Sequence, residues 1–177
     1  MKISVIGYSG AGKSTLACYL GEMLDIPVLH LDAVHWLPGW NVRPSTEKTA
    51  LVERFLNENS SWVIDGNYFS LSSEKRMKES DIIIFLDFNR FSCLRRVTAR
   101  YKKFKGRTRE DMGEGCEEKI DIEFIKWVLF SGRTSKIKKR YNSLREYCRG
   151  KFITLKNQKQ LDKFKEREIQ NLLLDDK

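Results

Sequence analysis

Long apolar runs are absent from this chain, and their absence limits the classes of protein to which it can belong. No segment approaches the ~20 consecutive apolar residues that a membrane-spanning helix requires. No basic stretch followed by an apolar one precedes the first expected strand, so the sequence predicts no secretory leader. We therefore expect a cytoplasmic protein without a membrane partner.

Proline and cysteine are scarce as well. The 177 residues include three prolines and four cysteines, and they contain no internal repeat or Pro/Ser-rich linker. This length and a hydrophobic content of 41% fit one globular domain that spans residues 1–177. The cysteines, at positions 18, 93, 116 and 148, are too far apart for a CxxC pair. Such spacing predicts reduced thiols, and neither a disulfide framework nor a structural metal site.

Acidic residues are nearly missing from two long stretches, which makes the charge uneven. The formal net charge is +9; residues 95–109 hold eight Lys or Arg and no acidic residue, and residues 133–151 hold eight more beside a single Glu146. A basic excess is typical of proteins that bind nucleic acid, an anionic membrane surface or a polyanionic small substrate. Solvated surfaces also carry many lysines, so composition alone leaves these alternatives open.

The most informative stretch that is present is GYSGAGKST, residues 7–15. Four residues separate Gly7 from Gly12, and Lys13 and Ser14 follow directly. Glycines let backbone N–H groups turn toward a phosphate, and a helix after the loop directs its positive end at the same anion. In such a P-loop the lysine bridges the β- and γ-phosphates and the serine hydroxyl ligates Mg²⁺. The predicted phosphate-binding residues are Gly7, Ser9, Gly10, Ala11, Gly12, Lys13, Ser14 and Thr15.

Strand-like and helix-like segments alternate along the chain. The expected strands are 2–6, 26–32, 61–68, 81–88 and 151–155. The apolar spacing predicts helices at 16–24, 46–59, 120–128, 137–144 and 161–172, and another from about residue 91. This alternation, with a phosphate loop after the first strand, predicts an α/β fold with a doubly wound, five-stranded parallel sheet. Ligands then bind beyond the carboxyl ends of the strands, where Asp32, Asp65 and Asp87 are expected.

The remaining features favour a small kinase among the proteins that carry a P-loop. The chain is shorter than most motor ATPases, and it has no NKxD motif of the kind that reads the base in GTPases. Small kinases place an acceptor-binding insert after the second strand, here about 32–60, and an arginine-rich lid later, here about 103–115. Guanidinium groups neutralise the charge that develops in phosphoryl transfer, and a closed lid excludes water. The arginines expected to converge are Arg96, Arg100, Arg107, Arg109 and Arg133.

Five segments carry a resemblance to one family. They are LDAVHWLPGW, WVIDGNY, IIIFLDFNRFSCLRRVTAR, GRTREDMGEGC and DIEFIKWV. With the phosphate loop, they resemble the P-loop nucleoside monophosphate kinase superfamily, the adenylate kinase-like proteins, and in particular the bacterial topology modulation (FlaR-like) proteins. The resemblance spans nearly the whole chain and implies that ATP and Mg²⁺ are bound.

The resemblance also implies roles for individual residues. Asp65 matches the carboxylate that organises Mg²⁺, alongside Ser14, and Arg96 and Arg100 match a pair that contacts the nucleotide phosphates. Lys156 and Asn157 stand where such kinases pass the nucleotide base. The residues predicted to act in catalysis are Lys13, Asp32, Arg100, Arg107 and Arg109.

The acceptor site departs from the adenylate kinase pattern. Those enzymes read Asp-Gly-Phe-Pro-Arg where this chain reads DGNYF, so the arginine that grips an acceptor phosphate is missing. Arg43 or Arg76 are candidates to replace it, and Asn67 and Tyr68 suit hydroxyls or an amide. Asp32 is expected to bind an acceptor hydroxyl, act as a base or order a magnesium-bound water, with a turn cap as the alternative. The predicted acceptor-binding residues are Asp32, His35, Trp36, Arg43, Gly66, Asn67, Tyr68 and Arg76.

Some candidate residues have two interpretations. His35, Trp36 and Trp40 either stack on a flat acceptor or pin the insert onto the body of the protein. His30 lies in an expected strand and is predicted to be a packed core residue. Asp87 shares the expected geometry of Asp65, but one acidic group is usually enough.

The leading functional hypothesis is an ATP-dependent kinase whose acceptor is a nucleotide or another small metabolite. A nucleotide-regulated, DNA-associated protein is the second hypothesis, supported by the basic stretches, although the chain has no helix-turn-helix or zinc finger. The third is an ATPase-like switch that has no acceptor except water.

Overall fold

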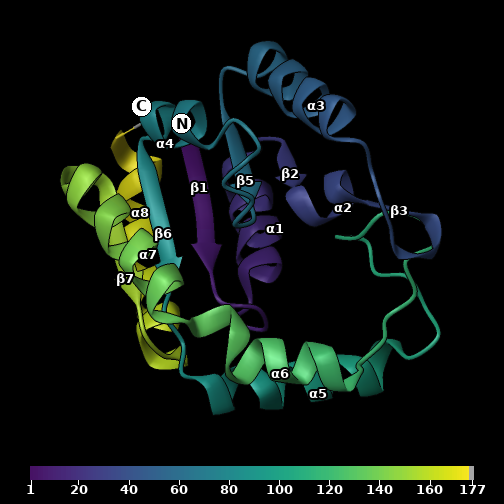
Figure 1. Cartoon of the computed structure of the whole chain (residues 1–177). Helices are drawn as coiled ribbons and strands as arrows, with labels where there is room; N and C mark the ends of the chain where they lie inside the picture. Colours follow the sequence, from purple (N-terminus) through teal and green to yellow (C-terminus); the bar gives the residue numbers. More distant parts are fainter. Residues whose placement is uncertain (176–177) are drawn as a thin grey trace.

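A five-stranded parallel sheet forms the centre of the protein (Figure 1). The computed structural model describes the chain from residue 1 to residue 175, with its side chains to residue 166. The strand order β2-β5-β1-β6-β7 confirms the predicted doubly wound sheet, because the chain leaves β1 first toward one edge and later toward the other. The strands are β1 (Lys2–Gly7), β2 (Val28–His30), β5 (Trp62–Asp65), β6 (Ile82–Leu86) and β7 (Phe152–Leu155).

Helices pack around this sheet and extend beyond its carboxyl edge. In Figure 1, α7 and α8 stand beside β6 and β7, whereas α5 and α6 cross below the end of β1. Three of the helices begin at polar caps, in which Asn89, Asp121 and Thr134 accept a backbone N–H from the first turn. The helices are α1 (Lys13–Leu24), α3 (Ser45–Glu58), α4 (Ser73–Glu79), α5 (Arg90–Phe104), α6 (Ile122–Leu129), α7 (Ser135–Tyr147) and α8 (Gln158–Asp175).

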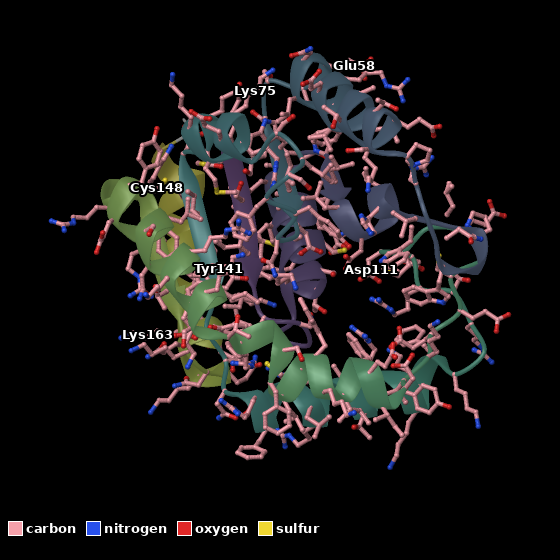
Figure 2. The ribbon with its side chains drawn as sticks, in the orientation of Figure 1. Glu58, Lys75, Asp111, Tyr141, Cys148 and Lys163 are labelled. Carbon is pink, nitrogen blue, oxygen red and sulfur yellow. The ribbon has the colours of Figure 1, made fainter. Side chains whose placement is uncertain are left out.

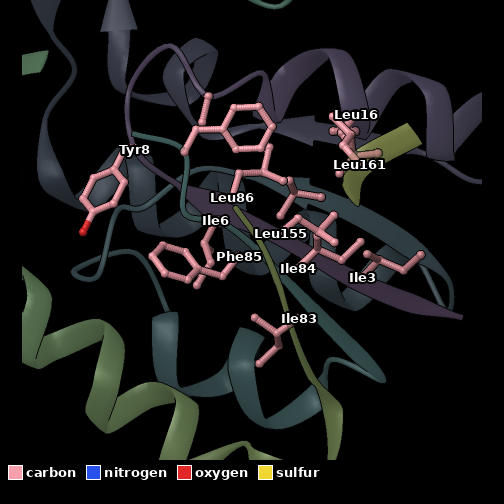
Figure 3. Close-up of a cluster of buried hydrophobic side chains, with 14 of the residues drawn as sticks. Ile3, Ile6, Tyr8, Leu16, Ile83, Ile84, Phe85, Leu86, Leu155 and Leu161 are labelled. Carbon is pink, nitrogen blue, oxygen red and sulfur yellow. The ribbon is translucent and has the colours of Figure 1, made fainter. Parts of the chain in front are cut away.

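Two apolar clusters stabilise the fold. The larger cluster fills both faces of the sheet, where Ile3, Ile84 and Leu86 are fully buried (Figure 3). The smaller cluster lies between α3 and β5 and contains Val52 and Trp62, both fully buried. Each such side chain stabilises the fold by about 1.5–3 kcal/mol relative to exposure. The smaller cluster therefore anchors the segment between β2 and β5 to the edge of the sheet.

The structure differs from the sequence prediction just after β2. The predicted strand 26–32 ends early, because Leu31–His35 form a short helix, α2, so Asp32 lies in a helical turn and not at a strand end. The predicted loop beyond it contains a small hairpin, β3 (Trp36–Leu37) and β4 (Asn41–Val42), joined by a 3₁₀ turn. The helix α4 is a further element that apolar spacing did not predict. Within the described residues, no helix is long and apolar enough to cross a membrane.

Candidate functional site

The loop between β1 and α1 has the shape that a phosphate requires. Gly7 and Gly10 have φ values of 145° and 79°, which L side chains rarely adopt. A Cβ at Gly10 would lie 2.7 Å from the carbonyl oxygen of Cys93, so the loop also passes too close to α5 for a side chain. Glycine is therefore required at these two positions by the backbone conformation and the lack of space for a Cβ.

Positive groups surround this loop. Lys13 and Ser14 begin α1, whose first turn contains no acidic residue, so its N–H groups and dipole favour an anion. The Lys13 ammonium group contacts only the loop carbonyl of Tyr8, at 3.5 Å, in the part of the chain with described side chains. Arg96 lies close enough that a Cβ at Gly12 would be 3.0 Å from its Nη1. Of the other predicted loop residues, Thr15 is exposed in the same turn.

A carboxylate with an unused oxygen stands at the end of the neighbouring strand. Asp65 is 3% exposed, and its Oδ2 lies 3.1 Å from Nδ1 of His30. Its Oδ1 is buried and has no hydrogen-bond partner among the described residues. Oxygen groups are the ligands that Mg²⁺ prefers, so Asp65 and the Ser14 hydroxyl fit the predicted metal ion. His30, whose side chain is 13% exposed, also contacts the Cys18 thiol at 3.5 Å, so this packed residue is at the same time a polar partner of Asp65.

A second group of side chains gathers on the acceptor side. The Tyr68 hydroxyl donates to Oδ1 of Asp32 at 2.6 Å. The ring of His35 stacks on Tyr68 with centroids 4.6 Å apart, and Trp36 meets His35 edge-on. Burial, reinforced by the Asp32 charge, raises the pKa of Tyr68, while burial and then Lys48 lower the pKa of His35. Four of the predicted acceptor-binding residues therefore form one cluster with a carboxylate, a phenol and two flat rings.

Three other predicted acceptor residues contact neighbouring segments of the protein itself. Arg76 is 1% exposed and donates to the carbonyls of Tyr68 and Leu71, so two of its guanidinium nitrogens support the loop after β5. Burial lowers its pKa to about 10. The Asn67 side-chain amide pairs with the backbone N–H and C=O of Gly7, at 2.9 and 2.5 Å, and so ties two loops together. Gly66 is needed for close approach, because a Cβ there would be 2.8 Å from that of Leu31.

Arg43 lies on a different hollow. Its Nε donates to the carbonyl of Val34 at 2.8 Å, and its Nη1 is 3.8 Å from Glu47. The hollow has a volume of about 370 Å³ and is lined by residues of β2, α2 and α3 together with Arg43, none of them from the phosphate loop. The backbone N–H of Arg43 donates to the carbonyl of His35 at 2.9 Å, so Arg43 adjoins the cluster around Asp32 through its backbone, while its guanidinium contacts Val34 and Glu47.

Two of the predicted lid arginines are held by one buried glutamate. Glu118 is 5% exposed, and its two oxygens accept from Nε of Arg100 at 2.8 Å and from Nε of Arg109 at 2.7 Å. Arg109 also donates to Asp111, and Arg107 is exposed. The prediction that these arginines face the phosphates takes no account of Glu118, which lies directly beyond the predicted lid, 103–115. Several acidic residues follow the arginine-rich segment, so the sequence did not single out Glu118.

The lid is joined to the acceptor insert. Three hydrogen bonds connect them: from the N–H of Gly39 to the carbonyl of Gly115 at 3.0 Å, from the Cys116 thiol to Leu37 at 3.3 Å, and from Nε1 of Trp40 to the carbonyl of Glu117 at 3.1 Å. In Figure 1 the trace between α5 and α6 runs up to β3, where this contact is made. Trp40 therefore pins the insert to the lid, and the lid covers the acceptor side.

Weakening Glu118 should loosen the lid without unfolding the sheet. The substitution Glu118→Gln leaves Arg100 without its carboxylate partner and leaves Arg109 with Asp111 alone, and hydrogen bonds to charged groups contribute about 1.5–3 kcal/mol each. We expect backbone amides between residues 105 and 121 to exchange hydrogen about ten-fold faster, with unchanged exchange in β1 and β6. Hydrogen-exchange mass spectrometry tests this, with exposed Glu117→Gln as the matched control. Equal exchange in both variants would contradict the assigned role of Glu118.

On the other side of the loop, Trp127 and Tyr8, which the sequence analysis did not select, lie with Arg133 and Asp87, which it named. Nε1 of Trp127 donates to the Ser9 hydroxyl at 3.1 Å, and the guanidinium of Arg133 lies 3.8 Å from the ring centroid of Tyr8. Burial raises the pKa of Asp87, which the charge of Arg133 opposes, so Asp87 belongs to this side.

The residues predicted to contact the nucleotide base, Lys156 and Asn157, are hydrogen-bonded to Gln160 in the first turn of α8. The backbone N–H of Lys156 donates to Gln160 at 2.7 Å, and the Asn157 side chain accepts from the N–H of Gln160 at 3.0 Å. Asn157 thereby caps the first turn of α8. Both residues follow β7 and so lie at the same edge of the sheet as the phosphate loop.

Comparison with known proteins identifies the fold. No protein-family model matches the chain. It is 26% identical over 127 residues to the uncharacterized protein YqaC of Bacillus subtilis (strain 168). The aligned residues make up 71% of this chain and 70% of that protein. Shikimate kinase from Acinetobacter baumannii, solved with shikimate, superposes with a TM-score of 0.58 at 18% identity, over 99% of this chain and 94% of that one.

Two further structures give the same result. TT1252 from Thermus thermophilus has a TM-score of 0.56 at 17% identity, over 99% of this chain and 97% of that one. Shikimate kinase from Bacteroides thetaiotaomicron has a TM-score of 0.51 at 18% identity, over 98% of each chain. At these identities the likeness shows the fold, which is that of the small P-loop kinases.

Proposed function

We propose that the protein is a Mg-ATP-dependent phosphotransferase that moves the γ-phosphoryl group of ATP to a hydroxyl group of a small acceptor. One observation carries the proposal: the phosphate loop, the buried Asp65 and the cluster around Asp32 all lie at the carboxyl edge of one sheet. That edge is where open α/β sheets bind their ligands. We also infer that the protein acts in the cytoplasm and shares this chemistry with the topology modulation (FlaR-like) proteins that it resembles.

The acceptor cluster favours a hydroxylated molecule over a nucleoside monophosphate. Of the two arginines considered for an acceptor phosphate, Arg76 is buried against backbone carbonyls and Arg43 lies on another hollow. The cluster offers a carboxylate and a phenol, with aromatic rings for a flat apolar face. A carboxylate and a phenol suit an acceptor hydroxyl and disfavour a second phosphate dianion.

The residues divide the reaction between them. Asp32 takes the proton from the acceptor hydroxyl. At the same time the hydroxyl oxygen forms a bond to the γ-phosphorus, and the bond between that phosphorus and the oxygen that leaves with ADP breaks. Lys13 and the N–H groups of the loop stabilise the charge that moves onto the phosphate oxygens. Mg²⁺, held by Ser14 with Asp65 nearby, supplies further charge neutralisation when bound. The lid, joined to the insert at Gly39 and Trp40, keeps water from the phosphoryl group.

Acceptor-dependent release of ADP tests this proposal. Wild-type protein and Lys13→Ala are given Mg-ATP with nucleoside monophosphates, nucleosides and hydroxylated metabolites in turn, and ADP is measured with a coupled assay. We expect one group of hydroxylated acceptors to raise ADP release well above the Lys13→Ala rate, and nucleoside monophosphates to have little effect. Release that no acceptor raises above slow hydrolysis would overturn the proposal and favour the ATPase-like switch.

Nucleic-acid binding has weaker support. Basic side chains are spread along α5 and α7, and the described residues include no groove-reading element beyond that charge. Charge alone gives binding that is insensitive to sequence and falls steeply with salt. A nucleotide-dependent preference for one DNA sequence would be required before that function replaced phosphoryl transfer.

A further inference from the structure

A buried lysine lies on the inner face of α3. Lys48, Val52 and Leu56 are spaced four residues apart, so they share one side of the helix, and all three are buried. The two apolar residues belong to the cluster between α3 and β5, whereas Lys48 is only 9% exposed and carries a charge. Lysine is rarely buried to this extent unless a partner meets its charge. The position of Lys48 therefore requires a reason other than apolar packing.

The Lys48 ammonium group reaches the acceptor cluster. In Figure 2, Glu58 marks the end of α3 that lies away from α2, and Lys48 belongs to the opposite end of that helix. Its Nζ lies 3.4 Å from Nδ1 of His35, and no carboxylate among the described side chains pairs with it. The adjacent Glu47 is 58% exposed and lies 3.8 Å from Arg43. Because a buried charge without a counter-ion is costly, an anion that a ligand brings would offset this cost.

Lys48 also fixes the protonation of His35. An ammonium group can only donate a hydrogen bond, so Nδ1 of His35 accepts, and the neutral imidazole carries its proton on Nε2. Burial and then the Lys48 charge lower the pKa of His35, against the opposing charge of Asp32, which agrees with a neutral ring. Among the described residues, none accepts a hydrogen bond from Nε2 of His35. The pair therefore offers a ligand one positive charge and one N–H donor.

This pair adjoins the carboxylate assigned to the acceptor hydroxyl. His35 follows Asp32 by three residues on α2, a spacing that places their Cβ atoms about 5–6 Å apart on one face of a helix. Tyr68 contacts both, because its hydroxyl donates to Asp32 and its ring stacks on His35. All three side chains belong to residues that are half-buried and not enclosed. An acceptor whose hydroxyl meets Asp32 therefore extends toward His35 and Lys48.

We propose that Lys48 and His35 form a subsite for a singly charged acidic group of the acceptor, which makes the acceptor a hydroxy acid and not a neutral alcohol. The role of the hydroxyl rests on the proposed function, whereas binding of the acid requires no ATP. An ammonium group and an N–H donor suit the two oxygens of a carboxylate. A phosphate dianion would bring a second negative charge close to Asp32, which repels it. Lys48 thus selects acids among hydroxylated acceptors.

Binding of two matched probes to the whole chain, without nucleotide, tests this subsite. The probes meta-hydroxybenzoate and meta-hydroxybenzamide have the same shape and differ in charge, and NMR of the His35 imidazole measures their dissociation constants. We expect wild-type protein to bind the benzoate at least about ten-fold more tightly, as a hydrogen bond between charged groups implies. Lys48→Met should remove this preference, and Lys48→Arg should retain most of it. Lys75→Met removes an exposed lysine of α4 (Figure 2) and should leave the preference unchanged.

The outcomes separate this subsite from the proposed function. Equal affinity of wild-type protein for the two probes would overturn the inference, and that comparison needs no variant if Lys48→Met does not fold. A preference that survives in Lys48→Met would show that Lys48 only packs α3 against α2, which also overturns it. In the coupled ADP assay, a neutral alcohol that raises ADP release more than its matching acid would contradict the subsite and leave the kinase intact. Release that no acceptor raises, together with a Lys48-dependent preference for the benzoate, would do the reverse.

Discussion

Replacing Lys13 with alanine is expected to slow acceptor-dependent phosphoryl transfer by about 10²–10³-fold, the usual effect of removing one preorganised charge-stabilising donor. Lys13 begins α1, and its ammonium group contacts only the carbonyl of Tyr8 among the described side chains, at 3.5 Å, so it is available to a phosphate. Because that contact is weak, the variant should fold normally. Steady-state kinetics with a saturating acceptor, together with a thermal melt, measure both effects.

Lys102→Ala is the matched control for this prediction. Lys102 is an exposed lysine in the last turn of α5, away from the phosphate loop. Its removal changes the net charge equally and should leave turnover within about two-fold, as expected for a surface substitution that touches no special feature. If the two variants had similar turnover, Lys13 would have no special role and the loop would not bind a reacting phosphate.

The second large effect is expected at Asp32. Asp32→Asn keeps the shape of the side chain but removes its ability to take a proton, and general-base catalysis contributes about 10²–10⁴-fold. Turnover with the acceptor should fall by that factor, whereas ADP affinity should stay the same, because Asp32 belongs to the cluster with Tyr68 and not to the phosphate loop. Calorimetry with Mg-ADP and the coupled ADP assay measure the two quantities separately.

Asp25→Asn controls for the loss of a carboxylate. Asp25 is exposed at the end of α1, where its φ of 51° suits asparagine equally well. It should therefore retain full turnover. A fall in ADP affinity in Asp32→Asn, matching its fall in turnover, would instead indicate that Asp32 supports the nucleotide site, and the assignment of a base would be wrong.

The fold was predictable because its strongest signals are local. Central strands such as Ile82–Leu86 are buried on both faces and therefore appear as continuous apolar runs. The glycines of the phosphate loop are required by backbone geometry, so the motif is present in the sequence itself. The short helix after β2 was missed, since Leu31 continues the apolar run of the strand and five residues are too few to show a helical period.

The site was predictable only in part, because its remaining features depend on contacts between distant segments. The cluster of Asp32, His35, Trp36 and Tyr68 was foreseen, since all are aromatic or acidic side chains near strand ends. The burial of Arg76 against backbone carbonyls was not predictable, because no sequence pattern shows that contact. The other features missed are the two hydrogen bonds that Glu118 accepts and the hydrogen bonds between lid and insert.

Transfer of a labelled phosphoryl group tests the central claim most directly. Wild-type protein, Lys13→Ala and Asp32→Asn are incubated with Mg-ATP that carries ¹⁸O on its γ-phosphoryl group and with a protein-free extract of small metabolites. Mass spectrometry then follows the label. We predict a labelled phosphate ester of a hydroxylated small molecule in the wild-type reaction, reduced at least about a hundred-fold in both variants. Label found only in inorganic phosphate, or only in unreacted ATP, would contradict the assignment of a phosphotransferase.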